Sequence, residues 1–226
     1  MSGFPDLSAF DLETLELVRQ LTMTSPERVA SLCGAARYIA RSKVEGAVVE
    51  CGVWAGGSML AAARTLISEG DTARSLYLFD TFTGMTEPTE HDVSLRGEHA
   101  SVVLGRMDPS DPRMNSPLEI AQRVMALSEY PADRVHFVQG KVEDTVPGRA
   151  PDKIALLRLD TDWYESTRHE LEHLFPRLAV GGVLIIDDYG HWKGARKAVD
   201  EYFGALDERI FLQRIDYTGR IAIRQG

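Results

Sequence analysis

The stretch VVECGVWAGGSMLAAARTL, residues 48–66, decides the fold class of this chain. It begins with a short apolar run that is typical of a buried strand and ends with a run of strong helix formers. Gly52, Gly56 and Gly57 lie in the turn between them. Glycines at such a turn let the backbone approach a ligand at the positive end of the helix, although they also occur there purely for tight packing. The spacing differs from the G-x-G-x-x-G fingerprint of dinucleotide-binding folds.

The alternation of strand and helix continues along the chain. Apolar runs separated by amphipathic helical patterns predict βαβ units and a parallel sheet. Ser116 to Glu119 has the pattern of a capping box at the start of a helix. We expect strands near residues 47–51, 75–80, 134–138, 153–159, 182–187, 210–215 and 220–224, and helices near 57–69, 117–129, 163–177 and 192–206.

Two segments do not follow this alternation of strands and helices. Residues 1–43 contain two amphipathic helices, and Ser25 and Pro26 are typical of the N-cap and first position of the second one. These helices can pack on the sheet, cover a site or form a dimer surface. Residues 81–115 form a long polar connection, and connections of that length are usually functional lids or disordered. An insertion without a role is the alternative.

Composition excludes several classes of protein. A chain of 226 residues with 44% hydrophobic and 26% charged residues is typical of one globular domain, here spanning residues 1–226. The net charge of −9 disfavours nucleic acid or an anionic membrane as a partner. No apolar run approaches the roughly 20 residues that span a bilayer, and no signal peptide is recognisable, so we expect a cytoplasmic protein. Cys33 and Cys51 are expected to be buried free thiols.

Two acidic residues end the first two predicted strands. Glu50 would be a poor neighbour for a pyrophosphate but a good one for a cationic ligand. Asp80 lies where an acidic residue commonly accepts hydrogen bonds from ribose hydroxyls, although it could also cap a turn. A ligand with a ribose and a positive charge but no phosphate fits both residues, and S-adenosylmethionine has these features.

Four more acidic residues follow two later strands. LLRLDTDWYEST, residues 156–167, contains Asp160 and Asp162, and an apolar run that begins near Gly181 ends on Asp187 and Asp188. Ligands of open α/β sheets bind at the carboxyl ends of strands, where these carboxylates would meet. Ionised carboxylates in such a place repel one another or take up protons, so the cluster requires compensation.

Five blocks in this chain together resemble the macrocin O-methyltransferase family, and the resemblance runs from about Thr24 to Phe203. The family contains bacterial, metal-dependent enzymes that methylate sugar hydroxyls on macrolide and aminocoumarin antibiotics. The blocks are VVECGVWAGGS, YLFDTFTGM, GKVEDTVP, LRLDTDWYEST and GGVLIIDDYGHWKGARKAVDEYF. The resemblance implies a class I methyltransferase fold, Rossmann-like, with a mostly parallel seven-stranded sheet, helices on both faces and an antiparallel last strand. It also implies that the N-terminal helices and the insertion serve as lid and subunit contacts, and that the chain is a homodimer or higher homo-oligomer.

The same resemblance implies the ligands and their residues. It implies S-adenosylmethionine at the glycine turn, its ribose on Asp80 and its adenine near residues 140–143. It implies a divalent ion, usually magnesium, on Asp160, Asp187 and Asp188, with Asp162 as the general base. The full set expected to bind the cofactor is Glu50, Gly52, Val53, Trp54, Gly57, Ser58, Asp80, Thr81, Gly140, Val142 and Asp160.

A magnesium ion would explain the acidic cluster in physical terms. It prefers about six oxygen ligands, of which a few are usually carboxylates. It would orient a sugar hydroxyl and lower the pKa of that hydroxyl, and Asp162 could receive the proton. Asp162 also begins a D-x-x-E pattern, so it could simply cap the next helix. His191 could bind substrate or assist proton transfer, or it could face solvent.

The resulting hypothesis is transfer of a methyl group from S-adenosylmethionine to a sugar hydroxyl of a glycosylated natural product. A catechol-like phenol is an alternative acceptor, because the metal would coordinate a vicinal diol in both cases. A nucleotide-binding module without catalysis is an alternative of another class. That module would not need Asp160, Asp187 and Asp188 together.

Overall fold

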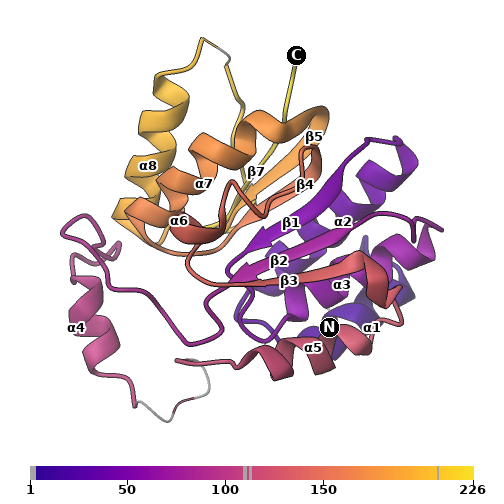
Figure 1. Cartoon of the computed structure of the whole chain (residues 1–226), viewed down its shortest axis with the longest axis horizontal. Helices are drawn as coiled ribbons and strands as arrows, with labels where there is room; N and C mark the ends of the chain where they lie inside the picture. Colours follow the sequence, from indigo (N-terminus) through magenta and orange to yellow (C-terminus); the bar gives the residue numbers. More distant parts are fainter. Residues whose placement is uncertain (1–3, 109–110, 112–113, 208) are drawn as a thin grey trace.

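The computed structural model describes residues 4–108, 111, 114–207 and 209–226. Its centre is a seven-stranded sheet with the order β3-β2-β1-β4-β5-β7-β6 (Figure 1). The five strands from β3 to β5 are parallel, whereas β7 is antiparallel to both β5 and β6. The predicted sheet and its antiparallel last strand are therefore confirmed. The strands are β1 (Ala47–Cys51), β2 (Leu76–Asp80), β3 (Val135–Gln139), β4 (Ile154–Leu159), β5 (Leu178–Ile186), β6 (Gln213–Arg214) and β7 (Arg220–Ile223).

Helices cover both faces of the sheet (Figure 1). One face packs against α1 (Ala9–Val18), α2 (Pro26–Arg41), α3 (Gly57–Ser68) and α5 (Leu118–Ala126). The other face packs against α7 (Tyr164–Leu174) and α8 (Lys193–Gly204), with the short α6 (Val142–Thr145) beside them. Neighbouring residues of a strand point to opposite faces. Accordingly Leu156 packs in the first core and Leu157 in the second.

The segment between α1 and α2 covers the start of α3. The N–H of Gly57 donates to the carbonyl oxygen of Leu21 at 2.8 Å, and the Thr22 and Ser58 hydroxyls lie 2.9 Å apart. A Cβ on Gly57 would lie 2.3 Å from that carbonyl oxygen, so only glycine permits this approach. The expected N-cap Ser25 and helical Pro26 are both present at the start of α2.

The long connection is folded at its base and contains an additional helix, α4 (Ala100–Gly105). The Asp92 side chain is fully buried, and its oxygens accept from the N–H groups of Tyr164 (2.8 Å) and Thr89 (2.7 Å). An antiparallel bridge joins Ser94 to Trp192. The connection is therefore fastened to the starts of α7 and α8 before it extends to α4, which lies at the periphery of the molecule (Figure 1).

Two local expectations, the capping box before α5 and the length of β6, were wrong, and one alternative, the cap role of Asp162, is excluded. Helix α5 begins at Leu118 with Pro117 in the N-cap position and no side-chain cap, so the capping box is absent because the helix starts too late for it. Helix α7 has Trp163 as its N-cap residue, again without a side-chain cap, so Asp162 is not a helix cap. Strand β6 is shorter than expected. Both cysteines are free and buried, as predicted, and no helix among the described residues is long and apolar enough to span a bilayer.

Candidate active site

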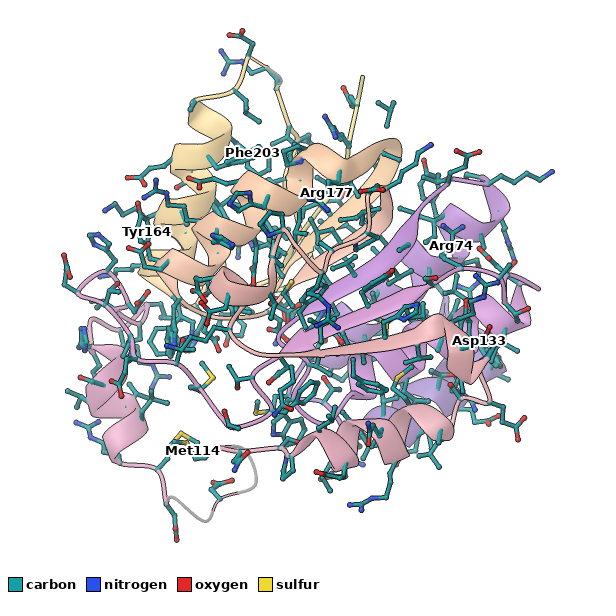
Figure 2. The ribbon with its side chains drawn as sticks, viewed as in Figure 1. Arg74, Met114, Asp133, Tyr164, Arg177 and Phe203 are labelled. Atoms are coloured by element: carbon teal, nitrogen blue, oxygen red, sulfur yellow. The ribbon has the colours of Figure 1, made fainter. Side chains whose placement is uncertain are left out.

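A cavity of about 380 Å³ opens at the carboxyl ends of the parallel strands. It lies between the sheet and the insertion, and Met114, one of its lining residues, is found between α4 and α5 (Figure 2). Most residues expected in the site line this one cavity. They are Gly52, Trp54, Asp80, Thr81, Gly140, Val142, Asp160, Asp162, Asp187, Asp188 and His191.

The glycine turn is shaped by Asp80. One oxygen of its carboxylate accepts from the N–H groups of Val53 (2.6 Å) and Trp54 (2.9 Å), and the other accepts from Phe82 at 2.7 Å. The turn also passes directly against the end of β4, because a Cβ on Gly52 would lie 2.0 Å from the Asp160 carbonyl oxygen. Asp80 therefore holds the turn in place while its side chain still borders the cavity.

Four of the residues expected to bind the cofactor do not line the cavity: Glu50, Val53, Gly57 and Ser58. Gly57 and Ser58 are covered by the segment between α1 and α2, and Val53 is buried. The start of α3 is thus closed by the chain itself, a contact that the local sequence pattern does not reveal.

Glu50 has a different cationic neighbour from the one expected. It is buried within β1 and stands in register with Arg158 of β4, whose Nη1 lies 2.5 Å from Glu50 Oε1. Burial raises the pKa of Glu50 to about 7, although Arg158 opposes this shift. The cation beside Glu50 is therefore a side chain of the protein rather than a ligand.

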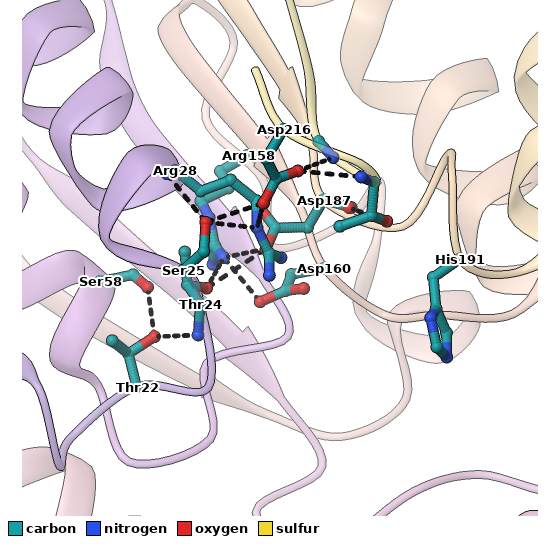
Figure 3. Close-up of polar contacts among 12 residues, drawn as sticks. Thr22, Thr24, Ser25, Arg28, Ser58, Arg158, Asp160, Asp187, His191 and Asp216 are labelled. Atoms are coloured by element: carbon teal, nitrogen blue, oxygen red, sulfur yellow. Dashed lines mark hydrogen bonds and ion pairs between the residues drawn. The ribbon is translucent and has the colours of Figure 1, made fainter. Parts of the chain in front are cut away.

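Arg158 also contacts two of the predicted metal ligands (Figure 3). Its Nη2 lies 2.8 Å from Asp160 Oδ2 and 2.8 Å from Asp187 Oδ2. Arg28, from the first turn of α2, pairs with the same oxygen of Asp187 and, at 3.0 Å, with Asp216 in the turn between β6 and β7. Asp160 and Asp187 are therefore held on the α2 side of the sheet by two guanidinium groups.

Asp162 and Asp188 form a second pair. Each carboxyl group affects the pKa of the other, and Asp162 Oδ1 accepts from Trp192 Nε1 at 2.9 Å. Each strand end therefore contributes one aspartate to each pair.

The electrostatics of the cluster follow from its burial. Burial, together with Asp160, raises the pKa of Asp162 to about 7. Burial also raises the pKa of Asp160 and that of Asp188 well above the usual value, and neighbouring carboxylates add to the effect. The pKa of His191 is lowered by burial and by Arg28, so the imidazole at the cavity wall is neutral near pH 7.

The chain matches the family described as macrocin-O-methyltransferase (TylF) over residues 17–224. The chain belongs to this family. It is therefore an O-methyltransferase, and the resemblance seen in its sequence blocks is confirmed.

Relatives and solved structures agree with this membership. The chain is 35% identical to a Streptomyces olivaceus 8-demethyl-8-(2,3-dimethoxy-alpha-L-rhamnosyl)-tetracenomycin-C 4'-O-methyltransferase, covering 88% of this chain and 73% of the relative. It is 31% identical to mycinamicin III 3''-O-methyltransferase of Micromonospora griseorubida, covering 85% and 75%. The structure of the O-methyltransferase NovP superposes with a TM-score of 0.82 at 25% identity, covering 96% of this chain and 98% of that one. The Bacillus cereus O-methyltransferase in complex with SAH, at 14% identity, covers 99% of this chain and 94% of that one with a TM-score of 0.59 and shares the fold.

The acidic residues of this methyltransferase fit a hard divalent cation by their chemistry. Asp160, Asp187 and Asp188 supply carboxylate oxygens at the ends of two neighbouring strands, and Asp187 Oδ1 is buried without a hydrogen-bond partner. Their carboxylate oxygens are not arranged around a single point in this structure. Among the residues that the structure describes, no three His, Cys, Asp or Glu side chains are placed to hold a metal. The guanidinium groups of Arg28 and Arg158 occupy Asp187 Oδ2 instead.

Several residues of the enzyme's site were missed from the sequence. Thr24 and Arg28 come from the N-terminal segment, and Tyr217 and Thr218 come from the C-terminal hairpin. No local pattern marks them. Arg158 did carry a signal, since a charged residue inside the apolar run of β4 implies a buried partner. The insertion contributes an apolar wall made by Met85, Val103, Leu104, Met107 and Met114.

Proposed function

We propose that this enzyme transfers the methyl group of S-adenosylmethionine to a sugar hydroxyl of a glycosylated natural product. The single observation that carries the proposal is the cavity in which four aspartates at two strand ends face the glycine turn of β1. Relatives at 35% and 31% identity are named for methylating a rhamnosyl tetracenomycin and mycinamicin III, which supports a glycoside acceptor.

The cofactor is proposed to lie across the ends of β1, β2 and β3. Gly52 and Trp54 would border its methionine portion, and Asp80 and Thr81 its ribose. Gly140 and Val142, between β3 and α6, would border the adenine. All six residues line the cavity, and structures that share the fold contain the cofactor product SAH, which supports this arrangement.

Asp160, Asp187 and Asp188 would hold a magnesium ion. Bound there, the ion would orient the acceptor oxygen and lower the pKa of its hydroxyl. The raised pKa values of Asp160 and Asp188 and the unpartnered oxygen of Asp187 support a site that gains from a divalent cation.

Asp162 is proposed to take the proton from the acceptor hydroxyl. The Trp192 N–H fixes one oxygen of this carboxyl group, and a pKa of about 7 suits a general base that works near neutral pH. Asp162 has a positive φ of 69°, which is unusual for a residue other than glycine and is common at functional sites. The neutral His191, whose ring contacts Trp192, would bind the acceptor at the cavity mouth.

The acceptor class is tested by direct competition. Purified enzyme with S-adenosylmethionine and magnesium should methylate rhamnosides that carry an apolar aglycone and should leave catechol unmodified, as measured by mass spectrometry. Methylation of catechol but of no glycoside would replace the sugar acceptor by a phenol. Cofactor binding without transfer to either class would favour the non-catalytic binding module.

The expected assembly and location remain predictions of the same proposal. We propose a homodimer in the cytoplasm, as the family resemblance implies. Light scattering of the purified protein measures the first, and fractionation of producing cells measures the second.

A further inference from the structure

Arg28 occupies an unusual place for a residue of a helical extension. Its side chain is only 11% exposed, and it reaches from α2 into the acidic cluster at the end of β5 (Figure 3). There it pairs with Asp187, whose side chain is fully buried. The oxygen that Arg28 contacts also accepts from Arg158 and from the Thr24 hydroxyl at 3.2 Å. The other oxygen of Asp187 has no partner.

The two arginines of the cluster differ in how easily they could leave it. Arg158 projects from the interior of β4 and is 3% exposed, with Glu50, Asp160 and Asp187 all in contact. Its backbone is fixed by strands on both sides. Arg28 projects from a helix end and lines the cavity.

Arg28 also has a second set of acceptors away from Asp187. Its Nε lies 3.0 Å from Asp216 Oδ2 and 3.4 Å from the Ser25 hydroxyl. Asp216 is itself held by Ser25 (2.8 Å) and by the N–H groups of Thr218 and Gly219. If Arg28 released Asp187, its charge would still be compensated by Asp216.

We propose that Arg28 is a resident cation that competes with the divalent metal for Asp187 and thereby sets the affinity of the site. This inference rests on the metal site of the proposed function. Binding of the metal moves Arg28 onto Asp216 alone, whereas loss of the metal returns it to Asp187. Arg28 is thus a positioning residue that keeps the acidic cluster compensated when no metal is bound.

The competition predicts the direction in which metal affinity changes when Arg28 is replaced. Removing a positive charge that lies beside a cation site should tighten cation binding, here about tenfold or more. The same change should destabilise the metal-free protein, because Asp187 then lacks one of its two guanidinium partners. A residue with a purely structural role would instead lower stability without tightening metal binding.

The test measures Mn²⁺ affinity by electron paramagnetic resonance on purified full-length variants, with circular dichroism to verify folding. Arg28→Gln should bind Mn²⁺ about tenfold more tightly than wild type, as expected for the loss of one adjacent charge. Its melting temperature should be lower without Mn²⁺ and should rise more than that of wild type when Mn²⁺ is added. Arg37→Gln is the matched control, because Arg37 lies on the same helix and pairs with Asp11 and Glu69 outside the cluster. It should leave Mn²⁺ affinity unchanged.

A second variant tests the same competition from the other partner of Arg28 and does not require Arg28→Gln to fold, because Mn²⁺ affinity in this variant that equals or exceeds that of wild type would by itself overturn the inference. Asp216→Asn removes the alternative partner of Arg28, so the guanidinium should hold Asp187 more firmly and Mn²⁺ binding should weaken. In the double variant with Arg28→Gln this weakening should largely disappear, which a double-mutant cycle measures. An equal loss in both backgrounds would overturn the inference, since Asp216 would then act independently of Arg28.

The outcomes separate this inference from the proposed function. If the wild-type enzyme methylates a glycoside while Arg28→Gln binds Mn²⁺ no more tightly than wild type, only the role of Arg28 is overturned. If neither wild type nor any variant binds Mn²⁺, both the metal site and the role of Arg28 are overturned. Tightening in Arg28→Gln but not in Arg37→Gln supports the inference whichever acceptor the enzyme uses.

Discussion

The carboxyl groups of Asp162 and Asp188 have different neighbours from those of Asp160 and Asp187, although all four side chains are aspartates. Four aspartates line one cavity, but Asp160 and Asp187 pair with arginine whereas no ion pair with arginine is seen for Asp162 and Asp188 among the described residues. Within the second pair, Asp162 is held by a neutral donor, the Trp192 indole. A carboxyl group with a pKa of about 7, such as that of Asp162, can both accept and release a proton near neutral pH.

Replacement of Asp162 by Asn should separate proton transfer from metal binding. We expect the turnover rate to fall roughly 10²–10⁴-fold, the usual contribution of a positioned general base. Mn²⁺ and S-adenosylmethionine affinities should stay near wild type, and added magnesium should not restore the rate. Steady-state kinetics and metal titration measure these quantities. A near-normal rate would leave the proton to solvent and remove Asp162 from the chemistry.

Asp160→Asn is the matched comparison for that variant. A neutral amide replaces a charged ligand, so metal affinity should fall and part of the lost rate should return at high magnesium. If both variants respond to magnesium in the same way, the two aspartates do not have separate roles.

Glu50 predicts a pH dependence of stability. Its pKa is raised by burial to about 7, so the folded chain keeps a proton that the unfolded chain releases above about pH 4.5. The contribution of Glu50 to the free energy of unfolding is therefore largest below pH 4.5 and decreases as pH rises through 7. Glu50→Gln lacks this titration, so its stability relative to wild type should improve between pH 5 and pH 8.

Urea unfolding at several pH values measures that difference. Glu90→Gln, at an exposed position, should show no comparable change relative to wild type across the same range. A constant difference between Glu50→Gln and wild type would mean that Arg158 keeps Glu50 ionised throughout.

At the scale of elements, the insertion has two parts. Its base contacts the starts of α7 and α8, and its outer part forms one wall of the cavity. The base is held by Asp92, which accepts from the first N–H of α7, and by the bridge between Ser94 and Trp192. Beyond the base, the α4 residues Val103 and Leu104 pack against a small apolar cluster that includes Trp192, whose indole donates to Asp162. Movement of the insertion would therefore shift the Trp192 indole, which donates to the proposed base Asp162.

Asp92→Ala should release the base of the insertion. It leaves the N–H groups of Tyr164 and Thr89 without their acceptor, which costs about 1–3 kcal/mol for a buried polar group. Limited proteolysis should then cut within residues 86–99, where the wild type should resist. Glu98→Gln is the control, because Glu98 forms an exposed pair with Arg106 that should contribute little. Unchanged cleavage in Asp92→Ala would mean that other contacts hold the base.

Sequence patterns predicted the elements that carry their own periodicity and missed those that depend on distant partners. The strands of the parallel sheet and the glycine turn were found because apolar runs and glycines mark them locally. The cap of α7 was missed because Asp92 lies 72 residues before the amide it binds. The short helices α4 and α6 were missed because they are too short for a periodic pattern.

The same limit applies to the site. Four aspartates after two strands were sufficient to predict a cluster at one edge of the sheet, and the structure brings them to one cavity. Their compensation by Arg28 could not be predicted, because that contact spans 159 residues and no sequence pattern marks it. The pairing of Glu50 with Arg158 could not be predicted for a related reason, since Arg158 belongs to a strand more than 100 residues later.

At the scale of the whole molecule, the cofactor and the metal are proposed to use different parts of the sheet. Apart from Asp160, which is expected to contact both, the proposed cofactor residues belong to the ends of β1, β2 and β3, whereas the metal residues follow β4 and β5. Chelation should therefore abolish methyl transfer while the affinity for S-adenosylmethionine, measured by calorimetry, stays within a few-fold of its original value. Full transfer by dialysed enzyme in excess chelator would contradict the metal role.

The contact between Arg28 and Asp216 joins residues that are 188 positions apart. A ribosome that makes this chain therefore produces Arg28 and Asp187 well before the turn that contains Asp216, Thr218 and Gly219. Until that turn emerges, the acidic cluster lacks both the anchor of Arg28 and the Thr218 hydroxyl that donates to the Asp187 carbonyl oxygen at 2.7 Å. The nascent protein can thus assemble most of its parallel sheet during synthesis, but the acidic cluster gains all of these contacts only after the turn between β6 and β7 has been translated.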